Sequence, residues 1–312
     1  MRVVFMGTPD FAVGTLEALV QSEHEVLAVV TQPDKPKGRG KAMQFPPVKE
    51  LALREEIPVY QPRKVRDPEF IEILKKIDPD VIVVIAFGQI IPQEIIDLPR
   101  YGCINVHASL LPKYRGAAPI QWAVINGEKE SGVTTMQMDA GLDTGDMLLK
   151  VVVPLETCET GGSLFDKLSK AGADLLIKTL KALGEGSITP QKQGESTTPY
   201  AKMLTKEMGK IDWNKEADSL EHLIRGLNPW PSAYTYLNGK TLKIWKADVE
   251  QGETKEKPGT VVKVGKKELK VQTGKDILSL KEVQLEGKKR MEIDAFLRGN
   301  AVEEGMVLGL TQ

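Results

Sequence analysis

The residues best suited to chemistry lie in one short segment, residues 105–112, whose sequence is NVHASLLP. Asn105 and His107 are two positions apart, and side chains at that spacing in an extended segment point to the same face. An asparagine amide can donate hydrogen bonds to a developing oxyanion without adding charge, and a histidine can donate a proton or stabilise negative charge. The two side chains could therefore act together on one small electrophile at the end of a strand.

A second cluster, residues 139–146 (DAGLDTGD), is a glycine-rich turn crowded with carboxylates. One of these carboxylates beside His107 would orient the imidazole ring and favour its protonated form. No serine or cysteine nucleophile belongs to this Asn/His/Asp set, which favours direct transfer to an amine over a covalent acyl-enzyme. Each feature also has a structural alternative: His107 as a structural histidine at a strand end, and the acidic turn as an ordinary hairpin or a hard-cation site.

The elements that must position these side chains alternate between strand and helix over about the first 185 residues. Strands are predicted at 2–6, 26–31, 81–86, 102–106 and 132–138, and helices at 8–20, 46–56 and 164–183. The continuous run VIVVIA at 81–86 indicates a strand buried on both faces. The pattern predicts an α/β fold, a Rossmann-like, mainly parallel sheet with helices on both faces. Ligands of such sheets bind beyond the carboxyl ends of the strands, which places a site near 7–10, 86–90 and 105–112.

The pattern changes at about residue 186. Residues 186–196 are polar and lack a period, which predicts a linker. A helix at 217–227 follows, and then short strands separated by turn signals such as Asn238-Gly239. Short strands at regular spacing are typical of a small barrel or sandwich. We therefore expect a catalytic domain at 1–185, a linker at 186–205 and a C-terminal domain at 206–312.

The charge of the 312-residue chain is unevenly distributed, although the formal net charge is only −1. Between Lys240 and Arg290, fourteen Lys and Arg residues stand against eight Asp and Glu residues. Such asymmetry suggests a polyanionic partner, most often nucleic acid, with a solvated Lys-rich β-surface as the alternative. Residues 32–41 (QPDKPKGRGK) form a second basic segment, which can follow phosphates and place an arginine among bases, or remain a solvated loop.

Composition argues against several classes of protein. No apolar run reaches the ~18 residues needed to cross a membrane. The short apolar N-terminus is broken at residues 7–10 and is not typical of a secretion signal. Cys103 and Cys158 lack CxxC spacing and a histidine at metal-ligand distance, which argues against a disulfide framework and a structural zinc site. We expect a soluble, cytoplasmic, monomeric protein without a metal.

Five stretches of the chain carry a resemblance to a known family: MGTPDFAV, TQPDKPKGRGK, GCINVHASLLPKYRGAAPIQW, TTMQMDAGLDTGDML and NPWPSAYT. Along essentially the whole chain, they resemble the folate-dependent formyltransferases, and within that family the enzymes that act on initiator tRNA. The resemblance implies that Asn105, His107 and Asp143 form the catalytic set. It also implies 10-formyltetrahydrofolate as the formyl donor and the α-amine of methionyl initiator tRNA as the acceptor, in translation initiation.

The resemblance further implies binding residues. The folate site would be lined by Ser109, Leu110, Leu111 and Pro112 and closed by Phe87, Gly88, Gln89, Ile90 and Asp139. The basic loop would reach the acceptor end of the tRNA through Lys35, Lys37, Arg39 and Lys41. Arg39 matches the arginine that helps to sense the unpaired first base pair. The C-terminal domain would be an OB-like β-barrel, a recurrent nucleic-acid platform, with candidate phosphate contacts at Lys266, Lys267 and Lys270.

Other functions are compatible with parts of the sequence. The same chemistry could act on a small amine, as in relatives that formylate glycinamide ribonucleotide or an amino sugar nucleotide, and another relative hydrolyses formyl-folate. The basic loop and the basic C-terminal region favour tRNA. A non-catalytic nucleotide- or RNA-binding protein is the alternative from another class. Against it, the first turn at 7–10 is not GxGxxG, no P-loop is present, and a binding protein has no need of Asn105 and His107 on one face.

Overall fold

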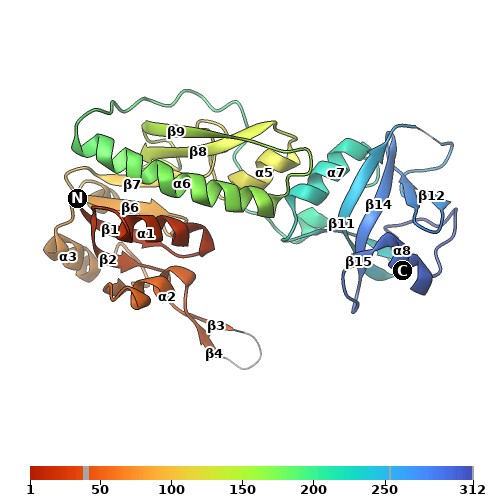
Figure 1. Ribbon diagram of the computed structural model, residues 1–312, viewed down its shortest axis with the longest axis horizontal. Helices are drawn as coiled ribbons and strands as arrows, with labels where there is room; N and C mark the ends of the chain where they lie inside the picture. The colour runs from red at the N-terminus through yellow and green to blue at the C-terminus, as the bar shows by residue number, and fades with distance from the viewer. Residues whose placement is uncertain (38–41, 253, 311–312) are drawn as a thin grey trace. The chain divides into compact units, whose positions relative to one another are not determined.

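The computed structural model describes residues 1–37, 42–252 and 254–310 (Figure 1). Its chain divides into two compact units. The first unit contains Met1–Pro119, Glu130–Pro154 and Phe165–Ala201, and the second contains Ile120–Lys129, Leu155–Leu164 and the chain from Lys202 onward. Each unit therefore draws on separated parts of the sequence. The domain boundaries expected at 185 and 205 stay a prediction.

The first unit is built on a seven-stranded sheet with the order β5-β2-β1-β6-β7-β8-β9. Its strands are β1 (Arg2–Gly7), β2 (Glu25–Val30), β5 (Val59–Tyr60), β6 (Val81–Ile85), β7 (Cys103–His107), β8 (Glu130–Gln137) and β9 (Met147–Pro154). All pairings from β5 to β7 are parallel, whereas β7, β8 and β9 pair antiparallel. The expected mainly parallel sheet is confirmed, and one of its edges is antiparallel.

Burial explains this arrangement of strands. Every side chain of β6 is buried, as expected for an uninterrupted apolar strand covered on both faces. The last six residues of β9 instead alternate between half-buried and exposed. That alternation is typical of an antiparallel edge strand with one face toward water.

Helices cover both faces of this sheet (Figure 1). They are η1 (Asp10–Ala12), α1 (Val13–Val20), α2 (Pro47–Arg54), α3 (Pro68–Ile77), α4 (Gln93–Ile96) and α6 (Gly161–Gly184). A further helix, α5 (Pro119–Ile125), belongs almost wholly to the second unit. α6 confirms the helix predicted at 164–183, and its leucines at 168, 176 and 180 form a buried apolar stripe. None of the helices in the described ranges combines the length and the apolar character that crossing a bilayer requires.

The helix predicted to begin at Thr8 begins later. The first helical turn starts at Asp10, and α1 starts at Val13. The Thr8 hydroxyl instead donates a hydrogen bond to the Phe87 carbonyl and accepts one from the Gln32 amide, both at 3.2 Å. The hydroxyl ties together the segments that follow β1, β2 and β6, so the prediction that the helix begins at residue 8 is wrong.

The second unit contains a six-stranded antiparallel sheet with the order β10-β11-β14-β13-β12, with β15 paired to β14. Its elements are η2 (Glu207–Gly209), α7 (Ala217–Gly226), β10 (Ala233–Leu237), β11 (Lys240–Glu250), β12 (Val261–Val264), β13 (Leu269–Gln272), β14 (Ile277–Leu285), β15 (Met291–Glu292) and α8 (Ile293–Gly299). Asn238 and Gly239 join β10 to β11 with φ of +49° and +75°, as the hairpin signal predicts. The expected small β domain is confirmed as an antiparallel sheet domain.

Candidate functional site

Asn105 and His107 lie on one face of β7, and antiparallel pairing to β8 fixes their positions. Asn105 pairs with Met136, and His107 pairs with Thr134. The His107 side chain is buried, and Asn105 is half-buried. Within residues 1–37, 42–252 and 254–310, no group hydrogen-bonds the side-chain amide of Asn105. A half-buried amide without a protein partner is available to a ligand.

Asp143 faces His107. Its Oδ1 lies 3.7 Å from His107 Nδ1, a charge contact that is longer than a hydrogen bond. Its Oδ2 accepts a hydrogen bond from the Gly116 amide at 2.9 Å. A different group orients the imidazole, because His107 Nε2 lies 3.0 Å from the Tyr114 carbonyl oxygen and donates its proton there. Nδ1, beside the carboxylate, is then the nitrogen left to exchange a proton.

The turn that carries Asp143 has a constrained backbone. Asp143 has a φ of +56°, a left-handed conformation that costs a residue other than glycine about 1 kcal/mol or more. Gly145 lies so close to β8 that a Cβ there would be 1.8 Å from the Gln137 carbonyl oxygen. Asp139, predicted to contact folate, is exposed, and its carboxylate accepts the Thr144 hydroxyl at 2.8 Å. Close packing and this hydrogen bond give the turn the shape that presents Asp143 to His107.

The segment after β6, predicted to close the folate pocket, has both exposed and buried side chains. Ile90 is 79% exposed, and the exposed Gly88 has a φ of +84°. Phe87 is buried, and the Gln89 side chain accepts the Val65 amide at 2.8 Å. Phe87 and Gln89 therefore support the segment from within, while its backbone at Gly88 and the Ile90 side chain are open to a ligand.

The segment after β7, predicted to line the folate site, also has both buried side chains and side chains that are open to a ligand. Ser109 and Leu111 are each 1% exposed. The Ser109 hydroxyl donates to the Lys113 carbonyl at 2.6 Å, and the Leu111 amide donates to a hydroxyl on β8 at 3.1 Å. Leu110 and Pro112 instead face a cavity of about 270 Å³. The other residues that line this cavity are Lys113, Tyr114, Glu130, Ser131 and Thr197.

Cysteine chemistry is disfavoured at this strand. Cys103 begins β7 and is buried. Burial raises the pKa of its thiol to about 12, so the thiol stays protonated near neutral pH and is a poor nucleophile. In the part of the chain that the structure describes, no group of three or more His, Cys, Asp and Glu side chains is arranged to hold a metal ion.

Comparison with known protein families agrees with this chemistry. Residues 1–180 match the family described as formyl transferase, and residues 203–301 match the formyl transferase C-terminal domain. The chain belongs to the formyl transferase family. A relative from Agathobacter rectalis, named methionyl-tRNA formyltransferase, is 62% identical over 307 residues, which cover 98% of each chain.

Two solved structures share the fold. The N-formyltransferase from Helicobacter canadensis, in complex with folinic acid and dTDP-3-aminofucose, has a TM-score of 0.66 at 19% identity and covers 89% of this chain and 98% of that chain. HypX from Aquifex aeolicus, in complex with tetrahydrofolic acid, has a TM-score of 0.63 at 18% identity and covers 98% of this chain and 50% of that chain. At these identities the likeness shows the fold alone.

In this member of the family, the basic segment of the first unit belongs to a small hairpin. The hairpin strands are β3 (Lys35–Lys37) and β4 (Ala42–Gln44). Lys35 is exposed, and the backbone of Lys37 ends β3. Arg39 and Lys41, also predicted to contact tRNA, lie outside the described residues.

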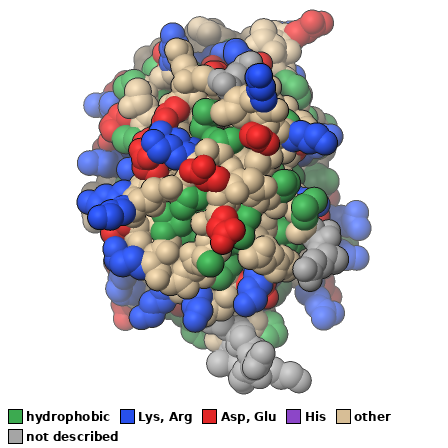
Figure 2. Space-filling model, turned by 90° about the vertical axis from the view of Figure 1, so that its right-hand side faces the viewer, with side chains coloured by type: hydrophobic (Ala, Val, Ile, Leu, Met, Phe, Trp, Pro, Cys, Tyr) green, Lys and Arg blue, Asp and Glu red, His purple; other side chains and the backbone are tan. Residues whose placement is uncertain are grey.

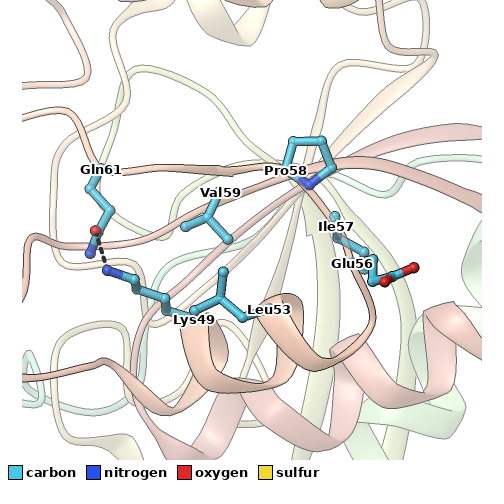
Figure 3. Close-up of a pocket in the computed structure, with 7 residues that line it drawn as sticks. All are labelled: Lys49, Leu53, Glu56, Ile57, Pro58, Val59 and Gln61. Atoms are coloured by element: carbon cyan, nitrogen blue, oxygen red, sulfur yellow. Dashed lines mark hydrogen bonds between the residues drawn. The ribbon is translucent and has the colours of Figure 1, made fainter.

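Lys49 is a structural cation close to the start of this hairpin. Its ammonium group contacts the Asp34 carboxylate at 2.7 Å and the Gln61 side-chain oxygen at 2.8 Å. Figure 3 shows Lys49 and Gln61 pointing toward one another. The hydrogen bond from Lys49 is the main cause that lowers the pKa of Asp34. A hollow of about 430 Å³ beside them is lined by Lys49, Leu53, Glu56, Ile57, Pro58, Val59 and Gln61, and it holds no amide and imidazole pair suited to formyl transfer.

The C-terminal lysines predicted to contact phosphate differ in their surroundings. Lys266 and Lys267 are exposed in the turn between β12 and β13. Lys270 forms ion pairs with Glu250 (2.7 Å) and Glu268 (3.7 Å), and its side chain is only 16% exposed. Figure 2 shows basic side chains spread over one face of the molecule with acidic side chains among them. Lys266 and Lys267 are therefore better placed than Lys270 to contact a phosphate.

Three contacts of His107 and Asp143, the pair proposed below as catalytic, were missed by sequence reasoning. Tyr114 and Gly116 act through a backbone carbonyl and a backbone amide, which carry no residue-type signal. The third is Gln193, whose side-chain amide donates to the Asp143 carbonyl at 2.9 Å. Gln193 lies in the polar stretch that the sequence pattern predicts as a linker, so no signal singled it out.

Proposed function

We propose that this chain transfers the formyl group of 10-formyltetrahydrofolate to the α-amino group of methionyl initiator tRNA, giving N-formylmethionyl-tRNA for translation initiation. One observation carries the proposal. The Asn105 amide, which has no side-chain partner among the described residues, shares a strand face with His107, whose Nδ1 is 3.7 Å from the Asp143 carboxylate. Such a set can stabilise negative charge and move a proton, as acyl transfer to an amine requires.

Each side chain has a defined task in this reaction. A formyl-folate supplies the carbonyl carbon that the amine attacks. A C–N bond forms to the amine, the bond to the donor nitrogen breaks, and one proton passes from the amine to that nitrogen. Asn105 donates a hydrogen bond to the carbonyl oxygen as negative charge develops there. His107 accepts and returns the proton at Nδ1, while Asp143 stabilises the ring in its charged form.

The surroundings of the catalytic pair fit a reduced folate. Gly88 and Ile90 are open after β6, and Leu110 and Pro112 face a cavity after β7. The similar structures from H. canadensis and A. aeolicus contain folinic acid and tetrahydrofolic acid. Both observations support a tetrahydrofolate derivative as the donor, and we propose the 10-formyl form.

The acceptor is proposed from the relatives and from the distribution of charge. Relatives with 52–62% identity over nearly the whole chain are named methionyl-tRNA formyltransferase. The hairpin that carries Lys35 and Lys37, and the exposed Lys266 and Lys267, supply cations that a small acceptor would not need. We propose that the protein acts as a monomer in the cytoplasm.

A formylation assay tests the reaction and the acceptor together. Purified protein is incubated with 10-formyltetrahydrofolate and methionyl-tRNA, and formylmethionine released from the tRNA is quantified by mass spectrometry. A second arm offers a dTDP-linked amino sugar, because a protein of the same fold was solved with one. We expect formylation of the tRNA only, and its loss in His107→Ala. Formylation of the sugar alone would overturn the acceptor, and no transfer by a folded protein would overturn the reaction.

A further inference from the structure

The polar segment 191–201 is held against the first unit at both of its ends. Gln191 and Met147 exchange two backbone hydrogen bonds of 2.8 Å each. At the other end, the Ala201 amide donates to the Arg115 carbonyl at 2.7 Å, and the Ala117 amide donates to the Ala201 carbonyl at 2.8 Å. The first end is bonded to Met147, which begins β9 just after the acidic turn. The second end is bonded to the loop after β7, whose Tyr114 carbonyl accepts the His107 proton. The segment is therefore fixed beside both partners of the catalytic pair.

Between these ends, Gln193 makes five hydrogen bonds through its side chain, and the longest runs 3.8 Å from Nε2 to the Met136 sulfur. Its Nε2 donates to the Asp143 carbonyl at 2.9 Å and to the Gly145 carbonyl at 2.7 Å. Its Oε1 accepts from Arg115, at 3.0 Å from Nε and 2.8 Å from Nη2. An amide side chain has two N–H donors and one oxygen with two lone pairs, so these bonds fix its orientation.

A second side chain of the segment supports the imidazole. Thr198 Oγ1 accepts the Tyr114 amide at 2.7 Å, and the Tyr114 carbonyl accepts the His107 Nε2 proton at 3.0 Å. Tyr114 and Asp143 have φ of +55° and +56°, values that residues other than glycine keep only where the surroundings enforce them. The segment thus bonds to both strained residues that set the separation of His107 and Asp143.

We infer that Gln193 and Thr198, two side chains of this segment, belong to the active site as positioning residues for Asp143 and His107. The inference rests on the proposed function, because the task it assigns is formyl transfer. Gln193 acts through the backbone of the acidic turn, and Thr198 acts through Tyr114. A segment whose composition predicts a linker therefore sets the geometry of the catalytic pair.

Gln193→Glu is the sharpest test because it changes the hydrogen bonds at almost constant size. The carboxylate of the variant can still accept hydrogen bonds from Arg115. It has no N–H to donate to the Asp143 and Gly145 carbonyls, so its oxygen repels both carbonyl oxygens. A small displacement of a catalytic group costs up to about 100-fold in rate, so kcat should fall by about tenfold to 100-fold. The KM values should change by no more than about twofold, since no substrate contact is removed. Lys192→Gln, at an exposed neighbour, should keep the wild-type kcat.

A double-mutant cycle separates positioning from a general loss of structure. If Gln193 acts through Asp143, Gln193→Glu should lower kcat far less in an Asp143→Asn background than in the native background. Equal losses in both backgrounds, or an unchanged kcat in Gln193→Glu, would overturn the inference. If melting curves show Gln193→Glu to be unfolded, Thr198→Val decides instead, with Thr189→Val as its exposed control.

An NMR measurement tests the inference without any activity. The chain has 3 histidines, so the imidazole signals of His107 can be assigned by substitution. These signals should shift in Gln193→Glu and stay in place in Lys192→Gln. Signals that stay in place in both variants contradict the positioning role. Signals that shift in a protein unable to formylate any acceptor contradict the proposed function and leave the positioning role supported.

Discussion

At the scale of single residues, Asn105 is the side chain whose role can be measured most directly. Removal of one oxyanion donor typically costs ~10²–10³ in kcat, and we expect that loss for Asn105→Ala. The free energy of unfolding should be nearly unchanged, because the amide has no hydrogen-bond partner among the described residues. Steady-state formylation kinetics and urea unfolding of the same preparation measure both quantities.

Asn105→Asp is the matched variant of nearly equal volume. It replaces an N–H donor by a charged acceptor, so it should be at least as inactive as Asn105→Ala. An effect of volume alone would leave Asn105→Asp close to wild type. A kcat for Asn105→Ala within about threefold of wild type would remove Asn105 from the mechanism, since that is far less than the loss of a donor.

His24 should make stability depend on pH. Its side chain is buried, Nδ1 lies 3.3 Å from the Met1 amine, and Nε2 has no hydrogen-bond partner among the described residues. Burial, and secondly the positive amine, lower the pKa of His24 below 6.5. Between the folded and unfolded pKa values the unfolded state binds more protons, so the free energy of unfolding falls as the pH drops through 6.5. Urea unfolding at pH 7.5 and at pH 5.5 measures this fall.

His24→Gln removes the titration and keeps a polar side chain of similar length. Its free energy of unfolding should decrease less than that of wild type between the same two pH values. Parallel losses in wild type and variant would show that other groups cause the pH dependence. Activity is not expected to differ, because no contact within the described residues joins His24 to His107 or Asp143.

The sequence predicts part of this residue-level picture. The two-residue spacing of Asn105 and His107 follows from strand geometry alone. Which carboxylate of the acidic turn faces the ring came from family resemblance, because three aspartates lie within eight positions. The Tyr114 carbonyl that orients the ring could not be predicted, because every residue has the same backbone carbonyl, whatever its side chain. Thr8 was assigned to a helix start because its competing partners, Gln32 and Phe87, are distant in sequence.

At the scale of elements, the acidic turn depends on a glycine for its close approach to β8. A Cβ at Gly145 would lie 1.8 Å from the Gln137 carbonyl oxygen, so Gly145→Ala must push the turn away from the strand. Forced displacement of this kind typically costs about 1–3 kcal/mol of stability. We expect that loss in urea unfolding together with reduced formylation, because Asp143 moves with the turn. Gly299→Ala is the control, since a Cβ there meets no atom within 4 Å; equal effects of the two substitutions would contradict the steric argument.

The elements themselves were predictable where their pattern is local. The apolar run of β6 and the apolar pattern of α6 predict the bounds of these two elements within a few residues of those in the structure. The antiparallel direction of β8 could not be predicted, because a buried strand has the same composition in either direction. The positioning role proposed for Gln193 and Thr198 could not be predicted either. Their side chains bond to loops more than 40 positions away, and a polar segment that is fixed by such contacts has the composition of a linker.

At the scale of the whole molecule, the uneven charge predicts how tRNA binding responds to salt. Each phosphate contact releases counterions, so the logarithm of the binding constant should fall linearly with the logarithm of the salt concentration. Replacement of a lysine that contacts phosphate makes this slope shallower by about 1. We expect Lys266→Gln and Lys267→Gln to make the slope shallower, because both side chains are exposed. Lys270→Gln should not, because Lys270 is already paired with Glu250 and Glu268.

Lys75→Gln serves as the control for charge without phosphate contact. Lys75 is on α3 and is paired with Glu72 at 2.9 Å and Glu94 at 3.0 Å, so its removal should leave the slope unchanged. Filter binding of methionyl-tRNA from about 50 to 200 mM salt covers the range in which phosphate contacts dominate. A flat response in wild type would exclude a basic tRNA platform. Equal changes of the slope for Lys266→Gln and Lys270→Gln would instead show that Lys270 leaves its ion pairs with Glu250 and Glu268 when tRNA binds. Ion pairing in the free protein would then not decide which lysines contact the phosphates.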